Sequence, residues 1–493
     1  MSYVKKLKPQ EFRLWRDKRP LLGQLDIELT ERCNNACLHC LINRPEHDEG
    51  AHSREMDTDF VKTLLRQAAD LGCLMVRFTG GEPLLREDFP ELYLCARRLG
   101  MRVILFTNGR LITEELADLL ARVPPGRWVE VSVYGMHTES YDASAGARGS
   151  FVEFRRGVER LKARGIPFVV KGAILPANKD EWEEFKAWAA EFPSMDHPPG
   201  ESMNFDLRAR RDDPAKNERI RKLRLSPEET VRTLARDPRY VSGMREFCAK
   251  FMGAPGDQLF RCGAGHGTCV DAYGRAQMCM PLRHPDTVFD LRVTDGGQPP
   301  AETCGRNSAD APQSERGLGG YSITPISTAP NPSGAGAKSK QALGAHSIAS
   351  PPTAAQPAGI RRSADIPPDP HSSGAGAANS HLSSNRATGA RESSPLKYAL
   401  AEFFPRLRET RATNPEYLRR CARCFLKGLC EQCPGKSWME HGTLDTPVEY
   451  LCAVAHAQAR YLGLLKDDEN SWDVETGKER VARFAAEGSG LNI

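Results

Sequence analysis

The sequence lacks the features that mark membrane proteins, exported proteins and nucleic-acid-binding proteins. No run of about 18 apolar residues occurs in the 493 residues, so no membrane-spanning helix is expected. The first 20 residues mix charged and polar side chains without an apolar core, unlike an export signal. The 68 Lys and Arg residues nearly balance the 64 Asp and Glu residues, and the formal charge of +4 is too small to indicate nucleic-acid binding.

Cysteine, by contrast, is abundant. Fifteen cysteines without an export signal favour metal or redox chemistry over disulfides, because the cytosol keeps thiols reduced, and we expect a cytoplasmic protein. Cys33, Cys37 and Cys40 fall within eight residues, directly after the apolar run 25–29. A closed zinc site and a fully ligated 4Fe–4S cluster each need four protein ligands, so three cysteines leave one iron open to a small molecule. A partial zinc site and a group of buried free thiols are the alternatives.

Short β-rich runs alternate with longer amphipathic runs between residues 25 and 207. The expected strands are 25–29, 74–78, 102–106, 128–134, 167–174 and 203–207. The expected helices are 56–71, 89–99, 113–122, 151–163 and 180–192. This alternation predicts parallel strands with right-handed crossovers, hence an α/β sheet or barrel. Functional loops then lie at the carboxyl ends of the strands, which is where the cysteine loop falls.

Three further polar or glycine-rich sites follow the next strands. Thr79 to Pro83 reads TGGEP, in which paired glycines let the backbone approach a ligand closely and proline stiffens the exit. On its own this is an ordinary tight turn. Asn108 and Ser132 end the third and fourth strands, where each fits either a turn or a ligand contact.

Taken together, these motifs resemble the radical S-adenosylmethionine (SAM) superfamily. The resemblance implies a partial (β/α)6 TIM-type barrel over residues 21–207, after an N-terminal extension of residues 1–20. It implies a SAM-binding 4Fe–4S cluster on the first three cysteines and SAM contacts from the motifs at the strand ends. The implied SAM-contacting residues are Gly80, Gly81, Glu82, Pro83, Asn108 and Ser132.

The resemblance also implies a reaction. An external one-electron reductant of the flavodoxin or ferredoxin type would reduce the open cluster, and SAM would be cleaved to a 5'-deoxyadenosyl radical that removes hydrogen from an unactivated carbon. The sequence does not identify a catalytic acid or base.

A second group of cysteines follows the expected barrel. Eight thiolates suit two fully ligated 4Fe–4S clusters, and their arrangement resembles the SPASM twin-cluster extension of radical SAM enzymes. The resemblance implies a first auxiliary cluster on Cys262, Cys269, Cys279 and Cys433, and a second on Cys421, Cys424, Cys430 and Cys452. Two residues separate Cys430 from Cys433 where three are typical, which departs from the family pattern. A zinc ribbon on the two C-x2-C pairs is the alternative.

The remaining segments complete the expected organisation. A basic, helical bridge covers 208–261, and its charge run 208–224 is expected on a solvated surface. The SPASM-like domain, a small cysteine-rich iron–sulfur domain, is expected in two parts, 262–290 and 396–466. Between them, the Ser-, Ala-, Gly- and Pro-rich insert 291–395 is predicted to be disordered, because it has too little apolar surface to bury. The charged tail 467–493 is expected to fray. Cys73, Cys95, Cys248 and Cys304 are interpreted as small apolar side chains or a linker thiol.

The kinship also suggests a substrate class. Relatives with the twin-cluster extension usually crosslink or oxidise ribosomally made peptides or proteins, and we expect the auxiliary clusters to relay electrons during such a reaction. Met280 stands where sulfatase-maturing members carry aspartate, which argues against that activity. About two dozen residues precede the first strand, so a leader peptide would need a separate recognition adaptor. The rival hypotheses are a non-enzymatic iron–sulfur carrier or redox sensor, and a zinc-stapled scaffold.

Overall fold

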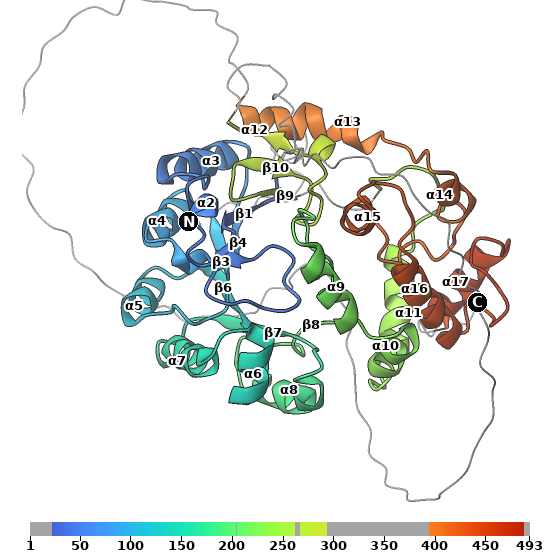
Figure 1. Ribbon diagram of the computed structural model, residues 1–493, viewed down its shortest axis with the longest axis horizontal. Helices are drawn as coiled ribbons and strands as arrows, with labels where there is room; N and C mark the ends of the chain where they lie inside the picture. Colours follow the sequence, from blue (N-terminus) through green and yellow to red (C-terminus); the bar gives the residue numbers. More distant parts are fainter. Residues whose placement is uncertain (1–21, 204, 262–266, 293–393, 488–493) are drawn as a thin grey trace, which may run out of the picture.

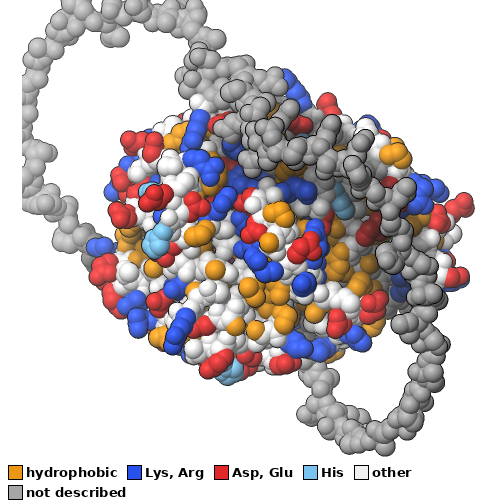
Figure 2. Space-filling view, in the orientation of Figure 1, with side chains coloured by type: hydrophobic (Ala, Val, Ile, Leu, Met, Phe, Trp, Pro, Cys, Tyr) orange, Lys and Arg blue, Asp and Glu red, His pale blue; other side chains and the backbone are white. Residues whose placement is uncertain are grey.

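The computed structural model describes residues 22–203, 205–261, 267–292 and 394–487. Figure 1 shows a strand-centred part surrounded by helices and, beside it, a helical part that carries the C-terminal end. On the face seen in Figure 2, acidic and basic side chains are interspersed, as the balanced charge leads one to expect. The predicted extension 1–20, Cys262, Cys304 and nearly all of the insert lie outside the described residues.

A nine-stranded sheet forms the centre of the molecule, in the order β11-β10-β9-β1-β4-β5-β6-β7-β8. Six of these strands are parallel to their neighbours and follow the predicted alternation. They are β1 (Gln24–Thr30), β4 (Met75–Gly80), β5 (Arg102–Thr107), β6 (Gly126–Val133), β7 (Phe168–Ala173) and β8 (Glu201–Ser202). The α/β fold class is therefore confirmed.

The sixth strand differs from its prediction. β8 ends at Ser202, and the predicted strand 203–207 is irregular in its described residues. Met203, Phe205 and Leu207 are buried and alternate with polar residues, which produced the strand prediction. Their side chains pack in two apolar clusters beyond the sheet. The chain then approaches the cysteine loop, where the Ala209 N–H donates to the Leu41 carbonyl at 3.0 Å.

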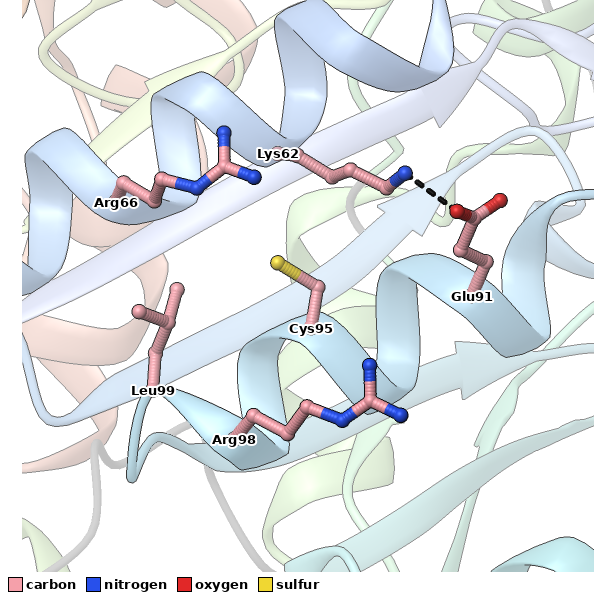
Figure 3. Close-up of a pocket in the computed structure, with 6 residues that line it drawn as sticks. All are labelled: Lys62, Arg66, Glu91, Cys95, Arg98 and Leu99. Carbon is pink, nitrogen blue, oxygen red and sulfur yellow. Dashed lines mark hydrogen bonds and ion pairs between the residues drawn. The ribbon is translucent and has the colours of Figure 1, made fainter. Parts of the chain in front are cut away.

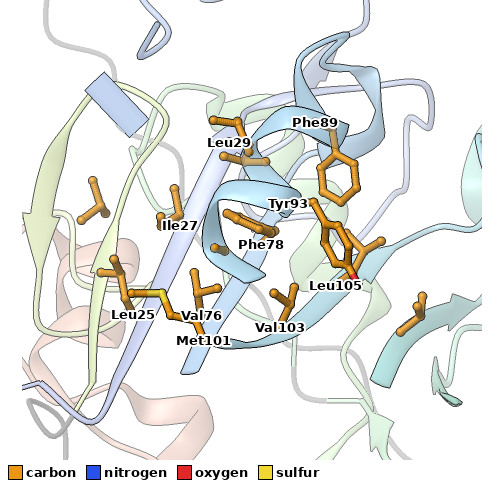
Figure 4. Close-up of a cluster of buried hydrophobic side chains, with 14 of the residues drawn as sticks. Leu25, Ile27, Leu29, Val76, Phe78, Phe89, Tyr93, Met101, Val103 and Leu105 are labelled. Atoms are coloured by element: carbon orange, nitrogen blue, oxygen red, sulfur yellow. The ribbon is translucent and has the colours of Figure 1, made fainter. Parts of the chain in front are cut away.

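Amphipathic helices connect the strands and cover the outer face of the sheet. They are α3 (Thr58–Asp70), α4 (Phe89–Arg98), α5 (Glu114–Arg122), α7 (Ser150–Ala163) and α8 (Trp182–Ala189), close to the predicted ranges. Two shorter helices, α2 (Glu49–His52) and α6 (Thr138–Ala145), were not predicted. Asp57 caps α3 by accepting the Phe60 N–H at 2.7 Å. Leu25 and Ile27 on alternate positions of β1 pack with Phe78 and Tyr93 between sheet and helices (Figure 4).

The segment that carries Cys269 and Cys279 extends the barrel sheet. β9 (Gly267–Val270) runs parallel to β1, with Cys269 opposite Asp26, and β10 (Arg275–Gln277) and β11 (Phe289–Asp290) follow in antiparallel pairs. Leu291, the first residue of the predicted insert, is buried in the core next to this edge. This part of the expected SPASM-like domain therefore shares a sheet with the barrel, a pairing that the sequence pattern did not predict.

Helices build the second part of the molecule. They are α9 (Pro214–Leu223), α10 (Pro227–Leu234), α11 (Tyr240–Phe251), α14 (Pro415–Arg419), α15 (Pro434–His441), α16 (Glu449–Tyr461) and α17 (Gly477–Ala486). Two other helices, α12 (Pro395–Tyr398) and α13 (Phe404–Arg408), pack instead on the barrel, where Leu396 and Phe404 are buried in its core cluster. The expectation that the tail frays is wrong for its described residues: Val481 and Phe484 of α17 are buried in one cluster with Met244 and Cys248 of α11. No helix in the described ranges is long and apolar enough to cross a membrane.

Candidate functional site

The three-cysteine loop leaves the carboxyl end of β1. Cys33 ends β2 (Arg32–Cys33), which pairs with β3 (Arg44–Pro45), whereas Cys37 is buried further along the loop. Backbone N–H groups of Asn35 and Asn43 lie 3.4 Å from the sulfurs of Cys33 and Cys40, respectively. The loop therefore turns its own amide dipoles towards two of its sulfurs, an arrangement that stabilises bound thiolates.

Burial opposes ionisation of these thiols while they are unbound. It raises the pKa of Cys37 to about 12 and holds the pKa of Cys33 well above its usual range. A thiol with a raised pKa is a poor nucleophile at neutral pH. A bound metal cation lowers the pKa again and holds the sulfur as thiolate. The donor set thus fits an iron–sulfur cluster, and the ligand roles of the three cysteines remain a prediction.

The TGGEP segment packs directly against the cysteine loop. A Cβ on Gly80, whose φ is +127°, would stand 2.2 Å from the Thr30 carbonyl oxygen, and one on Gly81 would stand 2.1 Å from that of Arg32. The close approach allows the Gly81 N–H to donate to the Thr30 carbonyl oxygen at 2.7 Å. It also allows the Glu82 N–H to donate to the Arg32 carbonyl oxygen at 2.9 Å. Glycine is therefore required at both positions for contact with the loop.

Glu82 connects this segment to the end of the next strand. Its side chain is fully buried; Oε1 accepts the Thr107 hydroxyl at 2.8 Å and Oε2 accepts the Asn108 N–H at 2.8 Å. Burial raises the pKa of Glu82 to about 7. Asn108 in turn donates through Nδ2 to Asn34 Oδ1 at 2.7 Å and lies 3.9 Å from the Cys33 sulfur. The structure thus brings Glu82, Asn108 and the cysteine loop together.

The other two predicted SAM contacts lie at the edges of this arrangement. Pro83 is buried and begins the short helix η2 (Pro83–Leu85), whose Leu84 N–H donates to Glu82 Oε1 at 3.1 Å. Ser132 is half-buried on β6, where its strand partner is Lys171 of β7. A SAM-binding role for either residue remains a prediction.

Basic residues from the helical bridge also hold the loop. The expectation of a solvated surface for 208–224 is wrong at Arg208, which is 3% exposed and donates to the Asn43 carbonyl at 3.1 Å. Lys216 of α9 is half-buried and donates to Asn43 Oδ1 at 2.5 Å. The carbonyl and amide partners of these two cations lie more than 160 residues away in the sequence. Because the sequence does not show such distant partners, the charge run on its own predicts a solvated surface.

A buried network of charges joins the loop to the segment carrying Cys269 and Cys279. Arg283 binds both carboxylate oxygens of Glu28 at 2.5 Å and Glu31 at 2.6 Å. Arg210 binds Glu31 at 2.7 Å and Asp271 at 2.8 Å. All three carboxylates are at most 1% exposed, and burial raises the pKa of Glu28 to about 7 against the opposing charge of Arg283. The ion pairs with Arg283 and Arg210 offset the free-energy cost of burying the three carboxylates.

The downstream cysteines occupy two places in the helical part. One cavity is lined by Cys421, Cys424, Cys430 and Cys452, and burial raises the pKa of Cys421 to about 12. Cys433 instead precedes α15, whose Gly435 packs against Pro281, two residues after Cys279. The four cysteines around the cavity fit a cluster with four thiolate ligands. Within the described ranges, no group of three or more His, Cys, Asp or Glu side chains is arranged to hold a single metal ion.

The inner face of the sheet is polar and reached by solvent. Arg77 pairs with Asp26 at 2.8 Å, and its guanidinium lies 4.7 Å from the centre of the Phe106 ring. Lys171 lies 3.8 Å from the same ring, forms an ion pair with Glu130 and is 41% exposed. This face presents charged and polar side chains from neighbouring strands.

A separate cavity of about 320 Å³ lies between α3 and α4 on the outer side of the sheet. Figure 3 shows Lys62 paired with Glu91 and the Cys95 sulfur between the two helices. The cavity lies on the helices that cover the sheet, whereas the cysteine loop lies at the carboxyl ends of the strands. We assign it no role.

The barrel is similar to a known protein family. Residues 27–189 match the model of the Radical SAM superfamily. The match includes the cysteine loop, the TGGEP segment, Asn108 and Ser132.

Two curated relatives with different names each match part of the chain. An Fe-coproporphyrin III synthase of Methanosarcina barkeri is 33% identical over 189 residues, which cover 37% of this chain and 45% of the relative. A PqqA peptide cyclase of Xanthomonas euvesicatoria pv. vesicatoria is 36% identical over 166 residues, or 34% of this chain and 44% of the relative. The chain thus spans less than half the length of either relative.

Solved structures show weaker similarity. Streptococcus suis SuiB bound to S-adenosylmethionine has 14% identity and a TM-score of 0.39, covering 57% of this chain and 68% of that one. Native anSMEcpe with bound AdoMet has 17% identity and a TM-score of 0.37, covering 52% of this chain and 74% of that one.

Proposed function

We propose that this protein is a radical SAM enzyme that cleaves S-adenosylmethionine reductively and removes hydrogen from a carbon of a peptide or protein substrate. The observation that carries the proposal is the three-cysteine loop of the radical SAM domain, packed against TGGEP and Asn108 at the carboxyl ends of the strands. A loop with three thiolates leaves one iron free for SAM.

Each part of the site has a proposed role. Cys33, Cys37 and Cys40 hold the cluster, which together with SAM supplies the electron transfer and the 5'-deoxyadenosyl radical. The residues proposed to contact SAM are Gly80, Gly81, Glu82, Pro83, Asn108 and Ser132. Glu82 joins the segment after β4 to the end of β5 by accepting hydrogen bonds from Thr107 and Asn108, which keeps the SAM-facing backbone in place.

The downstream cysteines support the auxiliary part of the proposal. We infer that Cys421, Cys424, Cys430 and Cys452 hold one auxiliary cluster and that Cys262, Cys269, Cys279 and Cys433 hold another. Four thiolates leave no open iron, so these clusters would relay electrons rather than bind substrate. A flavodoxin- or ferredoxin-type reductant in the cytoplasm would supply the first electron, and a separate adaptor would present a leader peptide.

Peptide substrates are supported by kinship. One relative is named a peptide cyclase, but an Fe-coproporphyrin III synthase matches the chain at similar identity, so these matches do not distinguish the two kinds of substrate. The proposed twin-cluster region favours the peptide. The charged inner face, with Lys171 exposed beside Glu130, suits polar groups of a peptide chain.

Anaerobic incubation of the reconstituted protein with dithionite and SAM tests the enzyme class. We expect 5'-deoxyadenosine and about twelve irons per chain, as three 4Fe–4S clusters require. Iron without 5'-deoxyadenosine would indicate a carrier or redox sensor, and stoichiometric zinc would indicate a scaffold. Parallel reactions with candidate precursor peptides and with an iron porphyrin, analysed by mass spectrometry, test the substrate class.

A further inference from the structure

The cavity lined by the four cysteines is completed by the C-terminal segment, residues 467–487. Trp472 lines the cavity, and Ser471 beside it is fully buried. The Trp472 ring lies 5.3 Å from the His456 ring and 4.6 Å from the guanidinium carbon of Arg420. These contacts build the segment into the wall of the site.

Ser471 places a hydroxyl beside one of the four sulfurs. Its Oγ lies 3.0 Å from Cys424 Sγ and 3.1 Å from His456 Nε2. His456 Nδ1 lies 2.8 Å from the Cys452 carbonyl oxygen, which can only accept, so Nδ1 carries the proton. Nε2 then accepts the Ser471 N–H at 3.3 Å. The Ser471 hydroxyl can donate either to His456 Nε2 or to Cys424 Sγ. A charged thiolate is the stronger acceptor of the two.

Arg420 places a cationic donor beside a second sulfur. Its Nη2 donates to Cys452 Sγ at 3.3 Å, while Glu449 binds the same guanidinium at 2.6 Å and Glu416 at 3.2 Å. The two carboxylates and the Trp472 ring fix the direction of the guanidinium. Two donors from different segments thus reach two different cysteines of one cavity.

We propose that Arg420 and Ser471 tune the iron–sulfur cluster of this cavity by donating hydrogen bonds to two of its thiolates. This inference rests on the iron–sulfur part of the proposed function. Reduction adds negative charge to a cluster, and donors to the ligand sulfurs stabilise that charge. The two residues therefore raise the reduction potential of this auxiliary cluster and make it a better acceptor of an electron from the substrate.

The test is an anaerobic redox titration of the reconstituted full chain, followed by electron paramagnetic resonance, with iron measured in parallel. The variants are Ser471→Ala, Arg420→Gln and the double variant. Arg419→Gln is the matched control for charge, because Arg419 directly precedes Arg420, is 60% exposed and pairs with Glu416. Ser437→Ala is the control for a buried hydroxyl, because Ser437 donates to the Thr446 carbonyl at 2.6 Å.

We expect one step of the titration to move to a more negative potential in each single variant and further in the double variant, at unchanged iron content. Both controls should titrate like the wild type. An unmoved step, an equal shift in the controls, or a loss of iron without a shift in the remaining clusters would overturn the inference. Formation of 5'-deoxyadenosine by the wild type is scored separately, so failure of the proposed SAM chemistry is distinguishable from failure of the tuning.

Discussion

Arg283 and Glu28 form a buried ion pair in which one guanidinium nitrogen lies 2.5 Å from both carboxylate oxygens. Both side chains are 1% exposed. Glu28 belongs to β1, whereas Arg283 follows Cys279 by four residues, so the pair joins the barrel to a segment proposed to hold an auxiliary cluster. The same guanidinium also binds Glu31, two residues before Cys33. One side chain thereby connects the surroundings of two proposed iron sites.

Arg283→Met should lower the free energy of unfolding by about 3–5 kcal/mol, because it leaves Glu28 buried without its cation and Glu31 with Arg210 alone. Urea unfolding monitored by circular dichroism measures the change. The control Arg292→Met removes an exposed arginine of the same segment and should cost less than about 1 kcal/mol. Equal effects of the two substitutions would contradict the assigned role of the pair.

The pH dependence of stability should reflect Glu82. Burial raises the pKa of this carboxyl from 4.5 to about 7, so the folded state binds its proton more tightly than the unfolded state. The contribution of Glu82 to stability is then greatest below about pH 4.5 and falls as the pH rises to about 7. Such a shift corresponds to about 3 kcal/mol. Glu82→Gln should flatten this part of the profile in urea unfolding of the metal-free protein, whereas the exposed control Glu91→Gln should not.

Gly81→Ala should separate the TGGEP segment from the cysteine loop, because the added Cβ would stand 2.1 Å from the Arg32 carbonyl oxygen. We expect at least a tenfold loss of 5'-deoxyadenosine formation, measured by liquid chromatography, since small displacements at such a site are costly. Gly243→Ala is the matched control, because that Cβ has no neighbour within 4 Å on α11. Wild-type activity in Gly81→Ala would refute the required contact.

Asn108→Ala removes the hydrogen bond to Asn34 and the amide near the Cys33 sulfur. We expect a higher KM for SAM and an about five- to thirtyfold lower kcat/KM, which corresponds to about 1–2 kcal/mol for the lost hydrogen bonds. Ser132→Ala should raise the KM for SAM with little change in iron content, because Ser132, on β6 opposite Lys171 of β7, is a proposed SAM contact and not a proposed cluster ligand. Unchanged SAM kinetics in both variants would exclude the two side chains as SAM contacts.

The parts of the fold that depend on local pattern were predictable from the sequence. Alternating apolar residues such as Leu25 and Ile27 mark a strand with one face against helices, and the structure confirms that pattern along the parallel sheet. The close packing of Cys33, Glu82 and Asn108 could also be anticipated, because the carboxyl ends of parallel strands meet at one edge.

Features that depend on distant partners were not predictable. Arg208 and Arg283 look like ordinary charged residues until the fold brings carbonyl and carboxylate oxygens to them. Phe205 alternates like a strand residue but packs beside the cysteine loop, where its ring lies 5.1 Å from that of His39. Ser471 sits in a charged tail, and only contact with Cys424 marks it as part of a site.

The most direct measurement is the iron content and 5'-deoxyadenosine yield of the Cys33→Ala, Cys37→Ala, Cys40→Ala triple variant beside wild type. With an open cluster on this loop, the variant should lose about four of about twelve irons and all detectable 5'-deoxyadenosine, while the auxiliary clusters remain. A triple variant with the iron content and the 5'-deoxyadenosine yield of the wild type would contradict the account.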